Sequence, residues 1–201
     1  MESFVSSQKV KDEVGYTIQG FHYTAVEGEV KHWELNAKDA VLYEKSKLVK
    51  ASEAKIKMFD SAGGVTNIQG DHADYLMNSK DLDLTGHVKV IFQDGFIVTT
   101  EKAHYTAKTG DIISDTPFYG ETSKADISTA TKGEVMQVWG VGFKANKLDP
   151  TIEIFSRVKA NMRRLETDEI THIESDLARV DRKTKMAFFW MKNSNKFVES
   201  K

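Results

Sequence analysis

Residues 68–75 read Ile68-Gln69-Gly70-Asp71-His72-Ala73-Asp74-Tyr75, and related versions of this stretch stand at 33–43 and 98–105. Each copy has an apolar start, a small residue, two polar residues, an alanine, and a tyrosine two or three positions later. The alanines Ala40, Ala73 and Ala103 lie 33 and 30 residues apart. Because recurrence at a fixed period is typical of stacked supersecondary units, the copies predict an elongated fold built from equivalent pieces.

Around these copies, from about residue 16 to residue 162, apolar residues mostly recur at every second position, as in 82–84 and 88–90. A period of two indicates strands with one buried face, and the polar alternate positions favour antiparallel pairing. Turn signals separate the strands at a regular pace, at 44–47, 61–64, 78–81, 93–95, 108–111, 131–133 and 146–150. We therefore predict an all-β fold of stacked antiparallel hairpins, in the form of a sandwich, barrel or jelly roll.

The last forty residues are compatible with two structures. Ile170, Ile173, Leu177 and Val180 fall at helical spacing, and residues 171–174 could form a capping box. The apolar run 186–190 instead indicates a buried strand after a polar turn. Periodicity alone leaves both structures open.

Composition excludes several functional classes. The formal net charge is -2 with no basic excess, which argues against a nucleic-acid partner. The chain has no cysteine, and its six histidines show no metal-ligand spacing. Residues 140–145 satisfy Gly-x-Gly-x-x-Ala, but Pro150 follows too soon for a helix to hold a pyrophosphate, so a bend or bulge is expected there. We expect no catalytic residue, metal or cofactor.

A set of large apolar residues is the remaining candidate for a binding site. Each one taken alone could be an ordinary core residue. Taken together, they could line a channel between two sheets that suits acyl chains. The predicted lining residues are Trp33, Ile56, Met58, Leu84, Val90, Phe92, Tyr105, Phe118, Trp139, Phe143 and Ile154.

Five fragments occur in an order that resembles the LptC family of lipopolysaccharide export proteins. They are Trp33-x-Leu35-x-Ala37-x-x-Ala40, Ile68-x-Gly70-x-x-Ala73-x-Tyr75, Leu82-x-Leu84-x-Gly86-x-Val88-x-Val90, Ile113-Ser114-Asp115-x-Pro117-Phe118 and Gly140-x-Gly142-x-x-Ala145. The resemblance covers about 16–162 and implies a twisted β-jellyroll without enzymatic activity. It implies that the protein binds the acyl chains of lipid A and relays lipopolysaccharide from the inner-membrane Lpt transporter complex to the periplasmic bridge.

The tail, from His172 to Phe188, is similar to the opening strands of the related bridge protein LptA, which favours strands over a helix there. The expected organisation is a flexible segment 1–15, an LptC-like jellyroll 16–162, and an extension 163–201 that adds strands of an LptA-like repeat. Strand edges would meet an LptA-like partner or a second copy of the chain. The N-terminal edge would lie near 16–25, and the C-terminal edge near 152–161 or 186–190.

The family resemblance also implies a periplasmic location and a tether to the inner membrane. The family carries an N-terminal transmembrane helix that is absent from this sequence, so either the anchor was removed or the chain is a soluble relative. Two rival functions stay open from the residues. One is an end-to-end β-strand adaptor without lipid cargo. The other is a carbohydrate-active enzyme on a β-sandwich, although no carboxylate pair stands out to support it.

Overall fold

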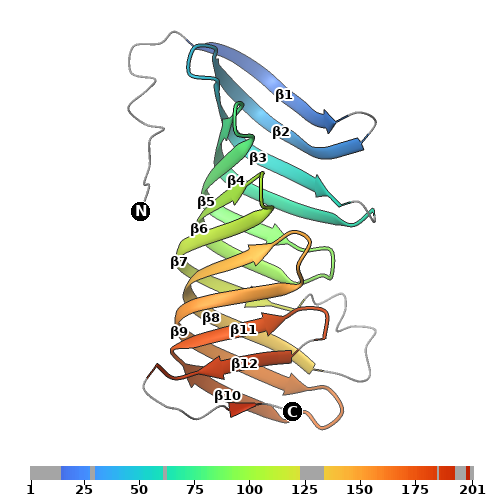
Figure 1. The fold of residues 1–201 in the computed structure, drawn as a ribbon, viewed down its shortest axis with the longest axis vertical. Coiled ribbons are helices and arrows are strands. Elements are labelled where there is room, and N and C mark those ends of the chain that lie inside the picture. The colour runs from blue at the N-terminus through green and yellow to red at the C-terminus, as the bar shows by residue number, and fades with distance from the viewer. Residues whose placement is uncertain are drawn as a thin grey trace.

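The computed structural model describes residues 15–27, 30–60, 63–122, 134–184, 186–192 and 198–199, and their strands form one thirteen-stranded antiparallel sheet (Figure 1). The strands are β1 (Tyr16–Glu27), β2 (Val30–Tyr43), β3 (Leu48–Phe59), β4 (Val65–Leu76), β5 (Asp81–Ile91), β6 (Ile97–Thr106), β7 (Asp111–Glu121), β8 (Glu134–Asn146), β9 (Thr151–Arg164), β10 (Ile170–Ser175), β11 (Leu177–Asp181), β12 (Met186–Trp190) and β13 (Val198–Glu199). Neighbours follow chain order from β1 to β9, so the predicted stack of hairpins is confirmed.

Successive turns alternate between the two ends of the strands. We call the turns at 44–47, 77–80, 107–110, 147–150 and 182–184 the first rim. The described turn residues 60, 63–64, 92–96 and 165–169 lie at the opposite strand ends and form the second rim. The turns predicted near 44–47, 78–81, 93–95 and 108–111 are confirmed, whereas the one at 131–133 lies outside the described residues. Residues 1–14 of the predicted flexible segment also lie outside them.

The long strands bend near their middle, and this bend folds the sheet in two. In β3 the buried positions change parity between Ala51 and Ala54, and the intervening Glu53 has a φ of 49°. Comparable register shifts interrupt the pairing of β4 with β5, β5 with β6, and β6 with β7 near their centres. An extra residue in mid-strand raises the local twist and turns the strand, so both halves present their apolar side chains to one interior. The predicted twisted β-jellyroll is therefore confirmed.

One continuous core fills the space between the two half-sheets. It extends from Trp33 in β2 to Phe189 in β12 as a single buried cluster. The strands lie across the long axis, so the core runs along the length of an elongated molecule (Figure 1). The expected division at residue 162 stays a prediction, because β9 crosses that position.

Residues of the tail form strands, and these strands change the expected sheet edge. β10 pairs with the second half of β9, and β11 pairs with its first half. The prediction of a C-terminal edge at 152–161 is therefore wrong, because β9 is covered on both sides. Among the described residues, β10 pairs with β9 alone, while β12 also pairs with β13 at Phe188 and Phe189. At the other end of the sheet, β1 pairs only with β2 in the described part of the chain.

The predicted bulge in the glycine pattern 140–145 is confirmed. These residues lie within β8, where the register with β9 shifts between Trp139 and Val141 and Gly142 has a φ of 74°. Pro117 sits at the corresponding shift between β7 and β8, where the missing N–H costs no ladder bond. Within the described residues, no helix is sufficiently long and apolar to cross a membrane.

Candidate functional site

The apolar interior between the half-sheets contains ten of the eleven side chains predicted to line a lipid channel. All ten belong to one buried cluster, and none has more than 5% of its surface exposed. They are Trp33, Ile56, Met58, Leu84, Val90, Phe92, Tyr105, Phe118, Phe143 and Ile154. The two inner faces pack on each other, so an acyl chain would enter this interior only if the half-sheets part.

Trp139 does not lie with the other ten side chains. Its neighbours Val138 and Gly140 are buried, so the alternation of β8 directs Trp139 outward, where it is 37% exposed. Its ring lies 5.2 Å from that of Tyr119, its register partner on β7. The expectation that Trp139 lines the interior is therefore not met. Position 140 is the one that faces inward, and only a glycine fits there. A Cβ on Gly140 would lie 2.7 Å from the Ile154 side chain.

The interior is open to solvent at the β1 end, which we call the N-terminal mouth. Tyr16 and Ile18 are in register with Leu42 and Ala40, and Ala40 belongs to the core. Directly paired residues of a sheet project to the same face, so Tyr16 and Ile18 also face inward. They are nevertheless 59% and 36% exposed. Apolar inner surface is thus available at this end without any movement of the half-sheets.

An aromatic cluster stands just behind the N-terminal mouth. Trp33 lies near the second rim and Tyr75 near the first. Their ring centroids are nevertheless only 4.8 Å apart, and the two ring planes are nearly perpendicular. Tyr23 of β1 completes the cluster, with centroids 5.3 Å from Trp33 and 5.4 Å from Tyr75. Burial and a hydrogen bond with Tyr23 raise the pKa of Tyr75, so this phenol stays neutral at physiological pH. The cluster joins the two half-sheets through apolar contact.

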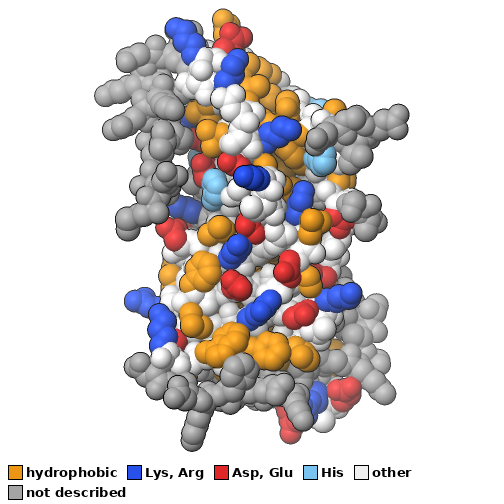
Figure 2. Space-filling model, viewed as in Figure 1, with side chains coloured by type: hydrophobic (Ala, Val, Ile, Leu, Met, Phe, Trp, Pro, Cys, Tyr) orange, Lys and Arg blue, Asp and Glu red, His pale blue; other side chains and the backbone are white. Residues whose placement is uncertain are grey.

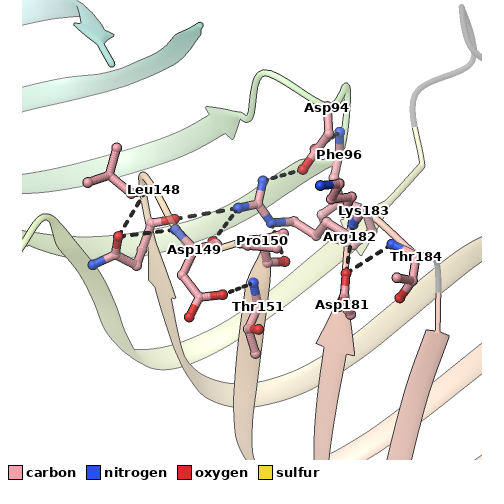
Figure 3. A network of polar contacts seen from close by, with 11 residues as sticks. Asp94, Phe96, Leu148, Asp149, Pro150, Thr151, Asp181, Arg182, Lys183 and Thr184 are labelled. Carbon is pink, nitrogen blue, oxygen red and sulfur yellow. Dashed lines mark hydrogen bonds and ion pairs between the residues drawn. The ribbon is translucent and has the colours of Figure 1, made fainter. Parts of the chain in front are cut away.

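The C-terminal end of the interior is closed by Arg182, in the turn between β11 and β12 (Figure 3). Its guanidinium donates to Asp94 at 2.6 Å, to the Pro150 carbonyl at 3.0 Å and to the Asp149 carbonyl at 2.8 Å. It also lies 3.9 Å from the centre of the Phe92 ring. The Arg182 side chain is 3% exposed and that of Asp94 is 24% exposed.

The charge of Arg182 is retained in this buried position. Burial lowers the pKa of the guanidinium, and the nearby Asp94, Asp149 and Asp181 oppose that shift. Because guanidinium is a very weak acid, it stays protonated. Removing one partner from a buried ion pair typically costs about 3–5 kcal/mol, since the other charge is left uncompensated. The contact is therefore a strong restraint on the turns that it joins.

Buried hydroxyl groups at the β6–β7 bend are fully paired and serve the fold. The Thr100 hydroxyl donates to the Pro117 carbonyl at 2.9 Å and lies 2.7 Å from the Thr116 hydroxyl. The Ser114 hydroxyl lies 3.2 Å from that of Thr100. These bonds satisfy backbone and side-chain groups where the ladder is interrupted, and they need no ligand.

The outer face carries paired charges of both signs. Lys50, Asp74, Asp83 and His104 lie in register across β3 to β6, with ion pairs of 3.0 Å between Lys50 and Asp74 and 2.7 Å between His104 and Asp83. The hydrogen bond to Asp83 raises the pKa of His104, although partial burial opposes the shift. No group of three or more metal-ligating side chains occurs in the part of the chain that the structure describes.

Charged and apolar side chains are distributed unevenly over one face of the molecule. Figure 2 shows Lys, Arg, Asp and Glu intermingled over its middle, with hydrophobic side chains gathered toward both ends, over β1 and β2 and near β11 and β12. The alternation in β12 directs Met186, Phe188 and Trp190 away from the core. This face therefore offers no single-sign field that would attract a polyanion.

Sequence reasoning found the interior but missed Arg182, Asp94 and the exposed inner side chains of β1. The run 181–185 indicated only a polar turn, and 93–95 only a hairpin. Arg182 and Asp94 are 88 residues apart, and no local pattern links them. The exposure at the N-terminal mouth follows from β1 being the last strand on its side of the described sheet.

Comparisons with known proteins found a family and solved structures that are similar to this chain. The model of a family described as LptC, lipopolysaccharide-assembly, LptC-related, matches residues 2–163. No curated protein matches the chain. One similar solved structure is LptH, the LptA homologous periplasmic component of the lipopolysaccharide transport device from Pseudomonas aeruginosa. The similarity covers 68% of this chain and 89% of that chain, with 13% sequence identity and a TM-score of 0.49.

Proposed function

The chain belongs to the LptC-related family of lipopolysaccharide-assembly proteins, and from that premise we propose that it holds the acyl chains of lipid A between its half-sheets. Family membership gives it a role in lipopolysaccharide transport. The observation that carries the proposal is the continuous apolar interior, which ends in an open apolar mouth at β1.

The energetics suit a carrier that must later release its cargo. Each acyl methylene removed from water contributes about 0.8 kcal/mol. The inner side chains are already buried against one another, so inserting a lipid replaces existing apolar contacts instead of burying new protein surface. The net affinity per methylene is therefore smaller than for an empty pocket. Binding would begin at the N-terminal mouth, where apolar inner surface still faces water.

Sheet edges are the proposed sites for protein partners in the periplasm. β1 offers a twelve-residue edge, and β10 offers a shorter edge at the other end. Each main-chain hydrogen bond formed by strand addition contributes about 0.5–1.5 kcal/mol. In this proposal β1 meets the inner-membrane Lpt transporter complex, and the C-terminal edge meets an LptA-like bridge protein. The tether to the inner membrane is likewise a proposal.

Site-specific photo-crosslinking tests where the lipid lies. A photoreactive residue at Phe92 or Tyr105, both on the inner face, should capture lipopolysaccharide. The matched outward positions are Lys57 and Lys89, whose neighbours in the alternation are buried. Capture at these outward positions alone would count against an internal site.

An end-to-end adaptor that carries no lipid is the second candidate function. The observation that favours it is the outer edge of β1. Within the described residues β1 pairs with β2 on one side, and no described strand pairs with its other side. It predicts filaments that grow with protein concentration and a melting temperature that lipid A does not change. A lipid-dependent rise in melting temperature would favour the carrier over the adaptor.

A further inference from the structure

The contact between Arg182 and Asp94 joins the two rims of the folded sheet. Arg182 lies in a first-rim turn and Asp94 in a second-rim turn (Figure 3). The two rims are separated by the length of a strand, and β5, which leads into the turn that carries Asp94, has eleven residues. In a flat sheet the two turns would stand at least about 35 Å apart along the strand direction alone. A 2.6 Å ion pair between them therefore spans the side on which the half-sheets come together opposite the bend.

This contact lies directly over the apolar interior. The guanidinium covers the Phe92 ring, one of the residues proposed to line the lipid site. A small space beside the ion pair holds about 20 Å³, and its lining residues are Asp94, Phe96, Thr122, Met136, Met162, Asp181 and Arg182. That is room for about one water molecule. An acyl chain cannot pass between the rims at this level while the ion pair is formed.

The turn that carries Arg182 is held in a fixed conformation. The Asp181 carboxylate accepts hydrogen bonds from the N–H groups of Lys183 and Thr184, both at 2.9 Å. The Arg182 N–H donates to the Pro150 carbonyl at 2.9 Å. Hydrogen bonds from nearby N–H groups lower the pKa of Asp181, so the restraint persists at neutral pH. These bonds fix the turn, so the guanidinium keeps one orientation toward Asp94 and can form the same ion pair again after it opens.

Arg182 belongs to the tail, beyond the residues 2–163 matched by the family model. Asp94 and Phe92 lie inside the matched part. The tail therefore reaches back across the interior and holds a turn of the family domain.

We propose that Arg182 and Asp94 form a latch by which the C-terminal tail keeps the outlet of the lipid site closed. Opening this pair lets acyl chains leave sideways between the rims near β11 and β12. Arg182 acts as a positioning residue in this role, because it controls the distance between the rims. This inference rests on the proposed function, since a latch has meaning only for a site that takes up lipid.

Crosslinking in the cysteine-free chain tests the latch without removing either residue. Gln93→Cys and Lys183→Cys, both at exposed positions next to the pair, can be joined by a short bis-maleimide across the rims. The control is Ser79→Cys with Lys108→Cys, in neighbouring turns of the first rim alone. Each protein is loaded with fluorescent lipid A before crosslinking, and transfer to acceptor phospholipid vesicles is then followed by fluorescence.

The latch predicts that the cross-rim link slows transfer at least tenfold, while the same-rim link changes it less than twofold. Asp94→Asn should speed transfer several-fold at a temperature where circular dichroism shows it folded, and Arg182→Lys should give an intermediate rate. Transfer at the unlinked rate from the cross-rim protein, with lipid A still bound, would overturn the latch and leave the proposed function standing. Failure of unmodified protein to bind lipid A would overturn both.

Discussion

The two ends of the apolar interior meet solvent in different ways. At the N-terminal mouth, Tyr16 and Ile18 face inward yet stay largely exposed, and an aromatic cluster of Tyr23, Trp33 and Tyr75 joins the half-sheets. At the C-terminal end, inward-facing Phe189 is 3% exposed, and an ion pair between buried Arg182 and partly exposed Asp94 joins the rims.

Aromatic contacts and a buried ion pair resist separation differently. Aromatic rings can slide past one another and contribute about 0.5–1.5 kcal/mol beyond their burial. A buried guanidinium keeps its energy only in one geometry, so it acts as a switch with a closed and an open state. In the proposed function, lipid would therefore enter by gradual parting at one end and leave through a discrete opening at the other. Each of the following predictions tests that contrast.

Truncating an inner aromatic residue at each end should give the largest difference in the free energy of unfolding. Phe189→Ala removes a buried ring and should lower the free energy of unfolding by about 4 kcal/mol. Tyr16→Ala removes an exposed ring, and its effect should stay within about 0.5 kcal/mol. Urea unfolding followed by circular dichroism measures both changes. Similar losses for the two variants would mean that the N-terminal mouth is closed in solution.

Removing the carboxylate of the latch should have the next largest effect. Asp94→Asn removes the carboxylate that contacts the buried Arg182 guanidinium and leaves only the more distant charges of Asp149 and Asp181, so unfolding should become easier by about 3 kcal/mol. The matched control toward the other end is Lys38→Gln, which breaks the exposed ion pair with Glu53. That variant should leave the urea midpoint unchanged, because both of its partners are solvated. A loss in the control equal to that of Asp94→Asn would remove the contrast between the ends.

Substituting two glycines that have similar φ angles compares how tightly the chain is packed around Gly20, toward the N-terminal mouth, and around Gly142 in β8. Gly20 in β1 has a φ of 65°, and a Cβ added there would have no atom within 4 Å, whereas a Cβ on Gly142 would lie 2.9 Å from the Phe155 ring. Left-handed backbone costs a non-glycine residue about 1–2 kcal/mol at either position. Gly142→Ala should therefore lower the free energy of unfolding by about 2 kcal/mol, and Gly20→Ala by about 1 kcal/mol. Thermal unfolding should rank the variants in that order, and the reverse ranking would contradict an open N-terminal end.

The smallest effect concerns pH and lies between the two ends. The pKa of His104 is raised in the folded protein, mainly by its hydrogen bond to Asp83. Its stabilising contribution is therefore complete below the unfolded pKa of about 6.5 and is lost as pH rises through the folded pKa. For this partly exposed pair we expect about 0.5 kcal/mol. The stability difference between the wild type and His104→Gln should shrink from about pH 5.5 to about pH 8.5.

The same titration should not alter the contrast between the ends. His104 lies on the outer face of β6, away from both the mouth and the latch. The stability gap between Phe189→Ala and Tyr16→Ala should consequently be the same at both pH values. A gap that closes at high pH would show that the ends are coupled through the outer face.

Much of the fold could be predicted because its evidence is local. The alternation around Leu82–Val90 indicates a strand, and Asp94-Gly95 supplies the backbone freedom that a tight turn needs. Pairing between consecutive strands follows once short turns join them. The inner residues followed from the same alternation, and Trp139 was misplaced because it was chosen for its size and not for its parity in β8.

The remaining features depend on contacts between distant parts of the chain. The C-terminal edge was expected at 152–161 or 186–190, but β10 and β11 both return to cover β9. The tail itself was compatible with a helix until its pairing with β9 selected strands. Tertiary pairing overrides such local ambiguity because a strand gains its stability from its neighbours.

The sequence by itself determined that this protein is all-β, that its hairpins repeat, and which side chains form its apolar face. Those properties follow from a two-residue period and from turn residues, both of which act over a few positions. Only the tertiary structure decided that the N-terminal mouth is open and that Arg182 closes the opposite end onto Asp94. Bending each strand at its middle brings the two rims together, so residues far apart in sequence become neighbours.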